Sequence, residues 1–400
     1  MISAILPQQI FTGETSLTNH AVIISGDRIM DIVSVDYLST DMPRQSYPDS
    51  FLAPGFIDTQ VNGGGGFLFN DDTSVNGIEG IARTHRQFGT TGLLPTLITD
   101  NPDKLEQALA AVNQAIQQKI PGVLGVHLEG PFLNKQRKGV HNAKKFRQPT
   151  SSDIQVLTQP HKGKVMVTVA PEMVGIDVIK ELATNGIIVS AGHTAATYEQ
   201  TRSALAAGLK GFTHLFNAMT PLQSREPGVT GAALLDPDSW CGIIADGHHV
   251  HYATLKLAIE LKPQGKVMLV TDAMPVTGSR QTEFVLDGKT IKRSNNRLET
   301  SDGVLAGCDL DMSQAVRNCV NSMGVTVAEA LRMASTYPAE YLGLGDQFGY
   351  IKSGYTSSLV LLDQQLMVEQ TWIDGIACHH KSSSNDNHKP YIDTLEASNT

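Results

Sequence analysis

The stretch GIIVSAGHTAATYEQTRSALAAGLKGFTHLFNA, residues 186–218, contains the repeating unit that decides the fold. An apolar run at 186–193 is followed by a helical pattern at 198–209 and then by a second apolar run at 211–218. Short apolar runs of this kind suit strands that are buried on both faces, as the strands of parallel sheets are. A strand, a helix and another strand in this order predict two parallel strands joined by a crossover helix.

The same alternation extends over most of the chain. Further apolar runs lie at 91–98, 122–130, 164–172, 241–249 and 266–273, and another helical pattern lies at 251–261. Several runs end in a polar or ionisable residue: Glu129, Glu172, His193, His214, His249 and Asp272. The carboxyl ends of parallel strands converge on one face of a (β/α)8 barrel, where several strands together can build a site. A doubly wound sheet would instead place its chemistry at one crevice, so the sequence favours an α/β fold of the (β/α)8 TIM-barrel type.

The two ends of the chain have a different pattern. Residues 21–33 and 348–378 alternate apolar and polar positions in short pieces, as antiparallel strands do. We therefore expect a small β-sandwich domain formed from both chain ends, by residues 1–52 and 346–380. The barrel is expected to occupy residues 53–345, and the polar tail at 381–400 is expected to be disordered.

Composition limits the classes of partner. The net charge of −9 argues against nucleic acid or an anionic membrane as a main partner. No apolar run is long enough to cross a bilayer, and the start of the chain lacks the basic region of a secretory signal. The four cysteines include no CxxC pair, which indicates buried free thiols in a reducing compartment. We therefore expect a cytoplasmic protein.

Three strand-end residues, Glu129, His193 and His214, form a candidate metal site. They are too far apart in sequence for a local zinc motif, but each ends an expected barrel strand. Two imidazoles and one carboxylate, with a fourth position left for water, are a common ligand set of catalytic zinc. A single strand-end histidine more often satisfies a hydrogen bond, whereas the three residues together favour metal binding.

Asp272, in LVTDAMP, is the expected partner of this site. A carboxylate beside a metal-bound water can accept its proton and later deliver it to a leaving group. An aspartate at a strand end could also cap the following helix. Gln60 and Asn62 stand where many metal-dependent hydrolases carry His-x-His. Amides are weak zinc ligands but bond well to waters and to ligand side chains, so we expect one metal ion rather than a bridged pair.

Residues 133–147 hold six Lys or Arg residues and no acid. Such a run is more often a solvated loop than a binding device. Because it directly follows the strand that carries Glu129, it could also steer an anionic substrate to the active face of the barrel.

Several motifs together resemble the N-acetylglucosamine-6-phosphate deacetylase family of the amidohydrolase superfamily. They are PGFID-x-Q-x-N-G, HLEGPFLN, KGVHN, AGHTAATY, THLFNAMTPLQSREPGVTG, GIIADGHHV and VTDA, in this order, and the resemblance runs from about residue 54 to 361. The family has a (β/α)8 barrel with a small β-sandwich domain, which agrees with the fold expected above.

The resemblance implies a role for each matched residue. It implies metal ligation by Glu129, His193 and His214, catalysis by Asp272, and the mononuclear branch of the family because of Gln60 and Asn62. The implied substrate contacts are Val140, His141, Asn217, Ala218, Arg225, His249, Leu305, Ala306 and Gly307. Of these, His141 matches the histidine near the acetyl carbonyl, and Leu305, Ala306 and Gly307 match a loop over the substrate.

The implied reaction is metal-dependent hydrolysis of the acetamide of N-acetylglucosamine 6-phosphate, with one divalent ion, Zn²⁺ by preference, in each subunit of a homodimer. The nearest alternative is the same chemistry on N-acetylgalactosamine 6-phosphate. A dihydroorotase would be expected to carry His-x-His and a carboxylated lysine, where this chain has Gln60, Asn62 and Glu129. A non-catalytic scaffold remains possible on fold alone, but it predicts damaged ligands.

Overall fold

The computed structural model describes residues 2–295 and 297–379. Residues 59–84 and 93–311 form one compact unit, and residues 2–58, 85–92 and 312–379 belong to a second one. The expected tail at 381–400 lies outside the described residues. The domain boundaries expected after residues 52 and 345 stay a prediction.

The barrel is an eight-stranded sheet in the order β15-β14-β13-β12-β11-β10-β9-β6. Its strands are β6 (Phe56–Val61), β9 (Thr90–Ile98), β10 (Gly125–Glu129), β11 (Lys164–Val169), β12 (Ile188–Ala191), β13 (Gly211–Phe212), β14 (Trp240–Ile243) and β15 (Val267–Leu269). The pairs from β9 to β15 are parallel and join consecutive strands. At the other edge, Asn62 N–H donates to Ala273 O at 3.0 Å and Asp272 N–H donates to Gln60 O at 2.9 Å. The chain after β15 thus returns to β6, which confirms the expected (β/α)8 barrel.

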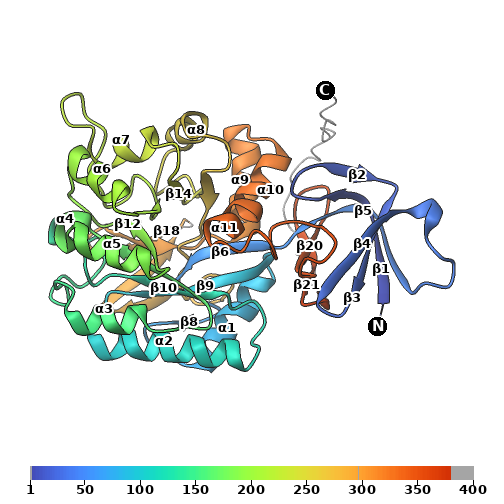
Figure 1. Cartoon of the computed structure of the whole chain (residues 1–400), viewed down its shortest axis with the longest axis horizontal. Coiled ribbons are helices and arrows are strands. Elements are labelled where there is room, and N and C mark those ends of the chain that lie inside the picture. The colour runs from blue at the N-terminus through green and yellow to red at the C-terminus, as the bar shows by residue number, and fades with distance from the viewer. Residues whose placement is uncertain (1, 296, 380–400) are drawn as a thin grey trace. The chain divides into compact units, whose positions relative to one another are not determined.

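Helices alternate with these strands. They are α1 (Val75–Arg86), α2 (Pro102–Gln117), α3 (Ser151–Thr158), α4 (Pro171–Val174), α5 (Ile176–Thr184), α6 (Tyr198–Ala206), α7 (Gly228–Leu235) and α8 (Tyr252–Leu261), with a 3-10 turn η2 (Lys135–Arg137). In Figure 1, α2, α3, α5 and α6 lie outside the barrel strands. A capping box between Thr197 and Gln200 fixes where α6 begins, five residues after His193. None of the described helices combines the length and apolar character that crossing a membrane requires.

Except for β9, which begins one residue before its apolar run, these barrel strands are shorter than the apolar runs that predicted them. The run at 164–172 ends as a strand at Val169, and Pro171 then begins α4. Proline suits the first position of a helix because its missing N–H would have no partner there. Glu172 therefore lies in a helix, and its expected place at a strand end was wrong.

The barrel unit carries two small sheets that the sequence did not predict. One is the hairpin β7 (Gly63–Gly64) and β8 (Phe67–Leu68), and the other is antiparallel, with β16 (Glu283–Leu286), β17 (Lys289–Ser294), β18 (Arg297–Thr300) and β19 (Leu305–Cys308). A buried cluster supports the second sheet, with Leu286, Ile291 and Leu298 beside Met274 and Val276. β19 is thereby packed against the segment that follows β15.

The second unit contains an eight-stranded sheet drawn from both chain ends. Its strands are β1 (Ile2–Phe11), β2 (Ser16–Thr18), β3 (His20–Ser25), β4 (Arg28–Ser34), β5 (Arg44–Pro54), β20 (Leu359–Leu362), β21 (Val368–Ile373) and β22 (Ile376–His379). β5 pairs with β1 on one side and with β20 on the other, so amino- and carboxyl-terminal strands share one sheet. This confirms the β domain built from both ends. The same unit includes η1 (Val35–Tyr37), α9 (Met312–Met323), α10 (Val327–Ala334) and α11 (Thr336–Tyr341).

Candidate active site

Glu129, His193 and His214 meet at the carboxyl ends of neighbouring barrel strands. Glu129 is the last residue of β10, while His193 and His214 each follow their strand by two residues. Glu129 Oε1 lies 3.1 Å from His193 Nε2 and 2.9 Å from His214 Nε2, and the two Nε2 atoms are 3.1 Å apart. All three side chains are buried. The structure thus brings together the three residues that the sequence singled out as ligands.

The donor set fits a divalent cation. His193 Nδ1 donates to Arg137 O at 2.8 Å, which leaves the Nε2 lone pair directed at the cluster. Burial alone would raise the pKa of Glu129, but its close contacts with the imidazoles of His193 and His214 hold that pKa well below its ordinary value. Burial would lower the pKa of His214, but its hydrogen bond to Glu129 raises that pKa. The centre therefore favours positive charge, which a bound cation would supply.

The backbone at the site is strained. His193, His214 and Asp272 have φ angles of 48°, 33° and 50°, in the left-handed region that L-residues with a Cβ rarely adopt. Such a conformation costs on the order of 1–3 kcal/mol per residue and persists only where the surroundings enforce it. Its occurrence at three candidate residues on three strands is typical of a functional site.

Asp272 is held by two amides. Its Oδ1 accepts from Asn62 Nδ2 at 2.6 Å and from Gln60 Nε2 at 3.2 Å. Burial, followed by the nearby charge of Glu129, raises the pKa of Asp272 to about 6. The carboxylate therefore faces the cluster rather than capping a helix. A carboxyl group with this pKa can both accept and return a proton near neutral pH.

Gln60 links the two carboxylates of the site. Its Nε2 lies 3.2 Å from Glu129 Oε2 as well as 3.2 Å from Asp272 Oδ1. Gln60 and Asn62 point inward from the end of β6 and support acidic groups from β10 and from the segment after β15. Both side chains are buried. Gln60 thus lies beside the candidate ligand Glu129, and both amides lie beside Asp272.

His141 lies next to His193, with ring centroids 4.3 Å apart. Its Nδ1 is 2.8 Å from the Thr99 hydroxyl. Burial, followed by the charge of His193, lowers the pKa of His141 to about 3, so the imidazole is neutral. Val140, the residue before it, packs against the apolar cluster around Met274.

The other residues expected to contact the substrate do not all lie near the cluster of Glu129, His193 and His214. Asn217 and Ala218 lie three and four residues after His214, and Ala218 O accepts from Thr194 N–H at 3.0 Å, which joins the loops after β12 and β13. Residues 305–307 belong to strand β19 rather than to the expected loop, because β19 pairs with β18 and forms a bridge to Ala273 beside Asp272. Arg225 is exposed, and within the described part of the chain no contact joins it to the cluster.

His249 donates its Nδ1 proton toward Asp246 Oδ2 at 2.7 Å. Both side chains are almost buried. His249 also lowers the pKa of Asp272, after the larger effects of burial, Glu129 and His214. The imidazole therefore lies close enough to the cluster to act on it electrostatically.

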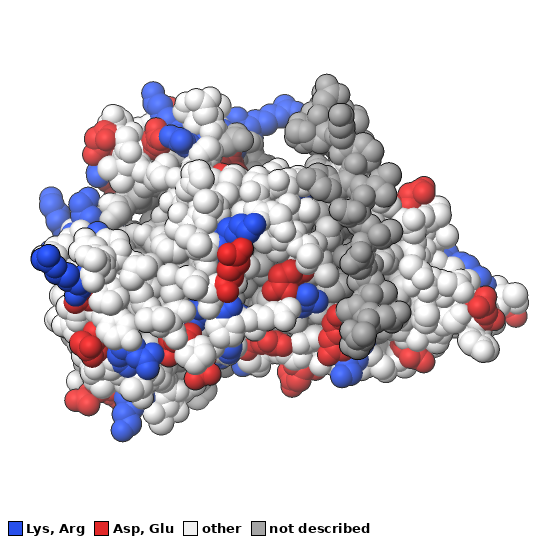
Figure 2. Space-filling model, turned by 90° about the horizontal axis from the view of Figure 1, so that it is seen from above, with Lys and Arg blue, Asp and Glu red and all other residues white. Residues whose placement is uncertain are grey.

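The basic stretch at 133–147 has a partly structural role. Lys145 bridges Asp100 and Asp287 at 2.8 and 3.0 Å, and Arg147 pairs with Asp153. Lys135, Lys138 and Lys144 are exposed and remain available to an anion. On the face seen in Figure 2, Lys and Arg side chains alternate with Asp and Glu rather than forming one basic patch.

Glu172 and Thr99 are supporting residues to which the sequence assigned no role. Glu172 accepts from Thr194 Oγ1 at 2.6 Å, from Ala195 N–H at 2.7 Å and from Asn134 Nδ2 at 2.9 Å. It thereby ties the loop that carries His193 to the loop after β10. Only their position in the sequence could have indicated these two residues, because each lies within three residues of the carboxyl end of a strand.

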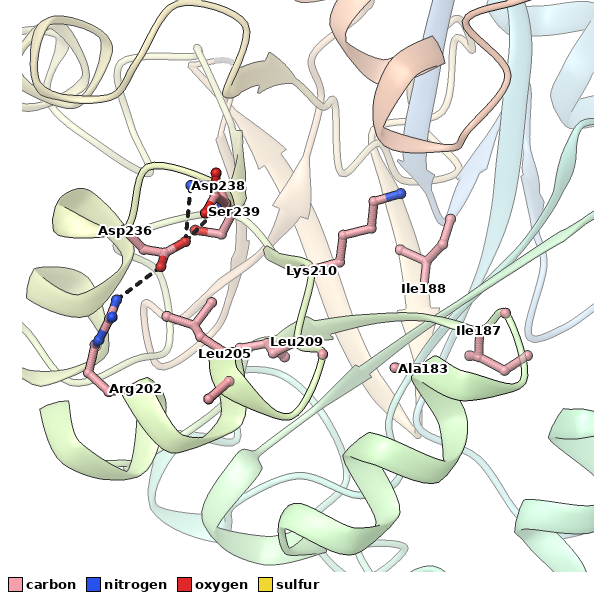
Figure 3. Close-up of a pocket in the computed structure, with 13 residues that line it drawn as sticks. Ala183, Ile187, Ile188, Arg202, Leu205, Leu209, Lys210, Asp236, Asp238 and Ser239 are labelled. Atoms are coloured by element: carbon pink, nitrogen blue, oxygen red, sulfur yellow. Dashed lines mark hydrogen bonds and ion pairs between the residues drawn. The ribbon is translucent and has the colours of Figure 1, made fainter.

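A cavity of about 540 Å³ lies at the opposite ends of the strands. Its lining includes Ile188 at the start of β12, Lys210 just before β13 and Ser239 just before β14, and Arg202 pairs there with Asp236 at 2.9 Å (Figure 3). The cavity contains none of the expected site residues. The amino-terminal face of such barrels generally serves stability rather than chemistry.

Comparisons with known proteins agree with this geometry. The Amidohydrolase family profile matches residues 51–378, and the NagA composite domain profile matches residues 4–46. The chain belongs to the amidohydrolase family. Members of this family typically depend on a metal, and the buried cluster of Glu129, His193 and His214 could hold one.

Named relatives of this amidohydrolase are similar over nearly their whole length. The N-acetylgalactosamine-6-phosphate deacetylase of Shewanella sp. (strain ANA-3) is 40% identical, with coverage of 90% of this chain and 92% of that protein. The N-acetylglucosamine-6-phosphate deacetylase of Haemophilus influenzae is 34% identical, with coverage of 92% and 96%. The crystal structure of N-acetylglucosamine-6-phosphate deacetylase from Pasteurella multocida superposes with a TM-score of 0.92 at 33% identity, covering 95% of this chain and 100% of that one.

Proposed function

We propose that this amidohydrolase hydrolyses the acetamide of N-acetylglucosamine 6-phosphate to glucosamine 6-phosphate and acetate, in amino-sugar catabolism. It is thus a hydrolase of a linear amide C–N bond. The observation that carries the proposal is the convergence of Glu129, His193 and His214 with a carboxylate, Asp272, that two amides orient. The similarity to named deacetylases over about nine-tenths of the chain supplies the substrate class.

We assign Glu129, His193 and His214 as the ligands of one divalent cation, with Zn²⁺ as the preferred metal. Imidazole nitrogen and carboxylate oxygen suit zinc in a catalytic site of three protein ligands. When bound, such a cation supplies Lewis acidity that polarises a carbonyl group and lowers the pKa of water. Gln60 and Asn62 occupy the place of a further imidazole pair, and this supports a single ion.

Asp272 acts as the general base and then as the general acid. Its carboxylate takes a proton from the attacking water and afterwards delivers it to the amine nitrogen that leaves. The amides of Gln60 and Asn62 hold Oδ1, so the other oxygen of Asp272 is the one that exchanges the proton. A pKa of about 6 lets the same group serve both steps.

His141 stabilises the acetyl oxygen. The Thr99 hydroxyl lies 2.8 Å from His141 Nδ1 and 3.3 Å from Glu129 O, and its one proton can be donated to either of them. When the hydroxyl donates to the nearer Nδ1, the single proton of the neutral imidazole lies on Nε2. This N–H can then donate to the oxygen on which negative charge develops. Thr99 is therefore a positioning residue that sets the tautomer of His141.

The sugar phosphate is held by the remaining expected contacts: Val140, Asn217, Ala218, Arg225, His249, Leu305, Ala306 and Gly307. Arg225 is exposed in this structure, so its guanidinium is free to turn toward a phosphate that arrives from solvent. The exposed lysines of the basic stretch favour the approach of the anion to an acidic protein.

The test is Asp272→Asn, assayed for acetate release with the metal content measured. General acid–base catalysis contributes about 10²–10⁴-fold, so the rate should fall by that factor while the metal content is unchanged. Asp238→Asn, an exposed aspartate at the opposite barrel end, serves as the matched control and should retain full activity. A fully metallated Asp272→Asn protein with a near wild-type rate would exclude Asp272 as the base.

N-acetylgalactosamine 6-phosphate is the second candidate substrate. The specific observation in its favour is that the Shewanella relative named for it is 40% identical, against 34% for the Haemophilus relative named for the glucosamine sugar. The two substrates differ only in the orientation of one hydroxyl. Measured kcat/KM values for both sugars decide which one the pocket prefers.

We further propose a cytoplasmic location and a homodimer. Three of the four cysteines, Cys241, Cys308 and Cys319, are buried free thiols, as is usual in a reducing compartment. The dimer rests on the family resemblance, and light scattering on the purified protein tests it.

A further inference from the structure

A second group of metal-binding side chains lies beside Asp272. Asp246 and His249 follow β14, and Cys308 is the last residue of β19. One potential ligand atom from each of the three lies within 4.8 Å of the others. Cys308 N–H donates to Asp272 O at 2.9 Å, which fixes this group next to the candidate base. It shares no residue with the cluster of Glu129, His193 and His214.

The carboxylate of Asp246 is already oriented for binding. Its Oδ1 accepts from the backbone N–H groups of His248 and His249, both at 2.9 Å. Its Oδ2 therefore points away from the backbone, toward His249 Nδ1 at 2.7 Å and Cys308 Sγ at 3.2 Å. Three different donor atoms thus converge on one position in an almost buried setting.

We propose that Asp246, His249 and Cys308 form a second metal site, which binds a thiophilic divalent cation such as Zn²⁺ or Co²⁺. Thiolate, imidazole and carboxylate are all established ligands of these ions, and three of them leave one position open. Binding displaces the thiol proton of Cys308 to solvent and requires the neutral tautomer of His249 that carries its single proton on Nε2, so that Cys308 Sγ and His249 Nδ1 both present lone pairs to the metal.

The second site fills after the first. The Cys308 thiol donates to Asp246 Oδ2 at 3.2 Å, so a metal must displace this thiol proton to reach the sulfur. At the first site, two imidazole nitrogens already lie 3.1 and 2.9 Å from one carboxylate oxygen of Glu129, and no thiol has to be deprotonated. The second site accordingly requires metal in excess over the amount that saturates the first site.

Occupation of the second site inhibits the deacetylase, a consequence that rests on the proposed function. His249 is one of the residues assigned to the sugar phosphate. A metal bound to His249 Nδ1 replaces the hydrogen bond to Asp246 and fixes the imidazole ring through a metal–nitrogen bond. Excess Zn²⁺ is therefore expected to inhibit, and Cys308→Ser is expected to require more Zn²⁺ for the same inhibition.

Titration of the metal-free full chain with Co²⁺ tests the site directly. A cobalt–thiolate bond gives an intense charge-transfer absorption in the near ultraviolet, which nitrogen and oxygen ligands of the first site do not produce. We expect this absorption to grow only beyond the first equivalent. It should be lost in Cys308→Ser and retained in the matched control Cys378→Ser, a change at the partly exposed cysteine of β22.

Glu129→Gln separates the two sites. This variant should lose the first, tight equivalent and keep the thiolate absorption. The proposal is overturned if no thiolate absorption develops at excess Co²⁺, or if Cys308→Ser retains it. Failure of the deacetylase proposal is distinguishable, because it would abolish turnover of both sugars without changing the absorption.

Discussion

Gln60→Met measures how strongly one amide supports the site. Gln60 donates to Glu129 and to Asp272, each at 3.2 Å, and its side chain is 1% exposed. Methionine has a similar volume but no donor. A hydrogen bond to a charged group contributes about 1.5–3 kcal/mol. Both hydrogen bonds of the Gln60 amide are long, so we expect each to contribute an energy at the lower end of this range. The free energy of unfolding of the metal-free protein should therefore fall by about 3 kcal/mol.

The assay is urea-induced unfolding of the metal-free barrel, followed by circular dichroism. Thr59→Val is the matched control on the same strand, because Thr59 Oγ1 is buried and has no hydrogen-bond partner among the described residues. Thr59→Val should be no less stable than the wild type, because it removes a buried hydroxyl that makes no hydrogen bond with the described residues. If Gln60→Met is likewise no less stable than the wild type, the amide does not support the two carboxylates.

The same substitution should change the pH dependence of turnover. Asp272 loses one of its two amide donors, so its pKa rises further above its ordinary value. A base must be ionised to accept a proton, and a higher pKa therefore moves the acid limb of the kcat/KM profile to higher pH. An unshifted acid limb in an otherwise well-folded variant would contradict this explanation.

Three further predictions concern supporting residues. Thr99→Val removes the hydroxyl that sets the tautomer of His141, and kcat should fall by about 10–100-fold with little change in metal content; an unchanged kcat would refute the positioning role. Glu172→Gln leaves one carboxylate oxygen fewer for three donors, so metal affinity, measured by competition with a chelator, should fall by about 10–100-fold. Burial alone would raise the pKa of Asp153, but hydrogen bonds from Arg147 and Thr150 lower this pKa in the folded protein. The ionised Asp153 therefore stabilises the fold above its unfolded pKa of about 4, and this stabilisation is lost as the pH falls through the lower folded pKa. Asp153→Asn should therefore reduce the urea midpoint at neutral pH, and its difference from the wild type should shrink in acid.

The periodic part of the fold could be predicted because it follows from local patterns. The alternation of apolar runs and helical stretches specifies the barrel, and a barrel brings the ends of β10, β12 and β13 to one face. Glu129, His193 and His214 were therefore expected to meet, although 85 positions separate the first from the last. Gln60 was expected near them for the same reason.

What could not be predicted depends on turns and long-range pairing. Pro171 ends one strand early and converts Glu172 from a strand-end group into a clamp between loops. The sheet β16–β19 consists of short strands whose pairing becomes evident only in three dimensions. Asp246 was not assigned a role because its importance lies in the side chains it meets, and one of these, Cys308, belongs to β19 and lies 62 positions away in the sequence.

Because the backbone is left-handed at His193, His214 and Asp272, substitutions that raise stability at these positions would also remove the side chains that activity requires. Glycine or asparagine would relax each of them, because these residues tolerate positive φ far better than others do. A library sorted only for heat resistance would therefore accumulate such replacements there and lose catalysis. Engineering for thermal tolerance should instead fill the hollow at the amino-terminal ends of the strands, where added apolar volume leaves the chemistry untouched.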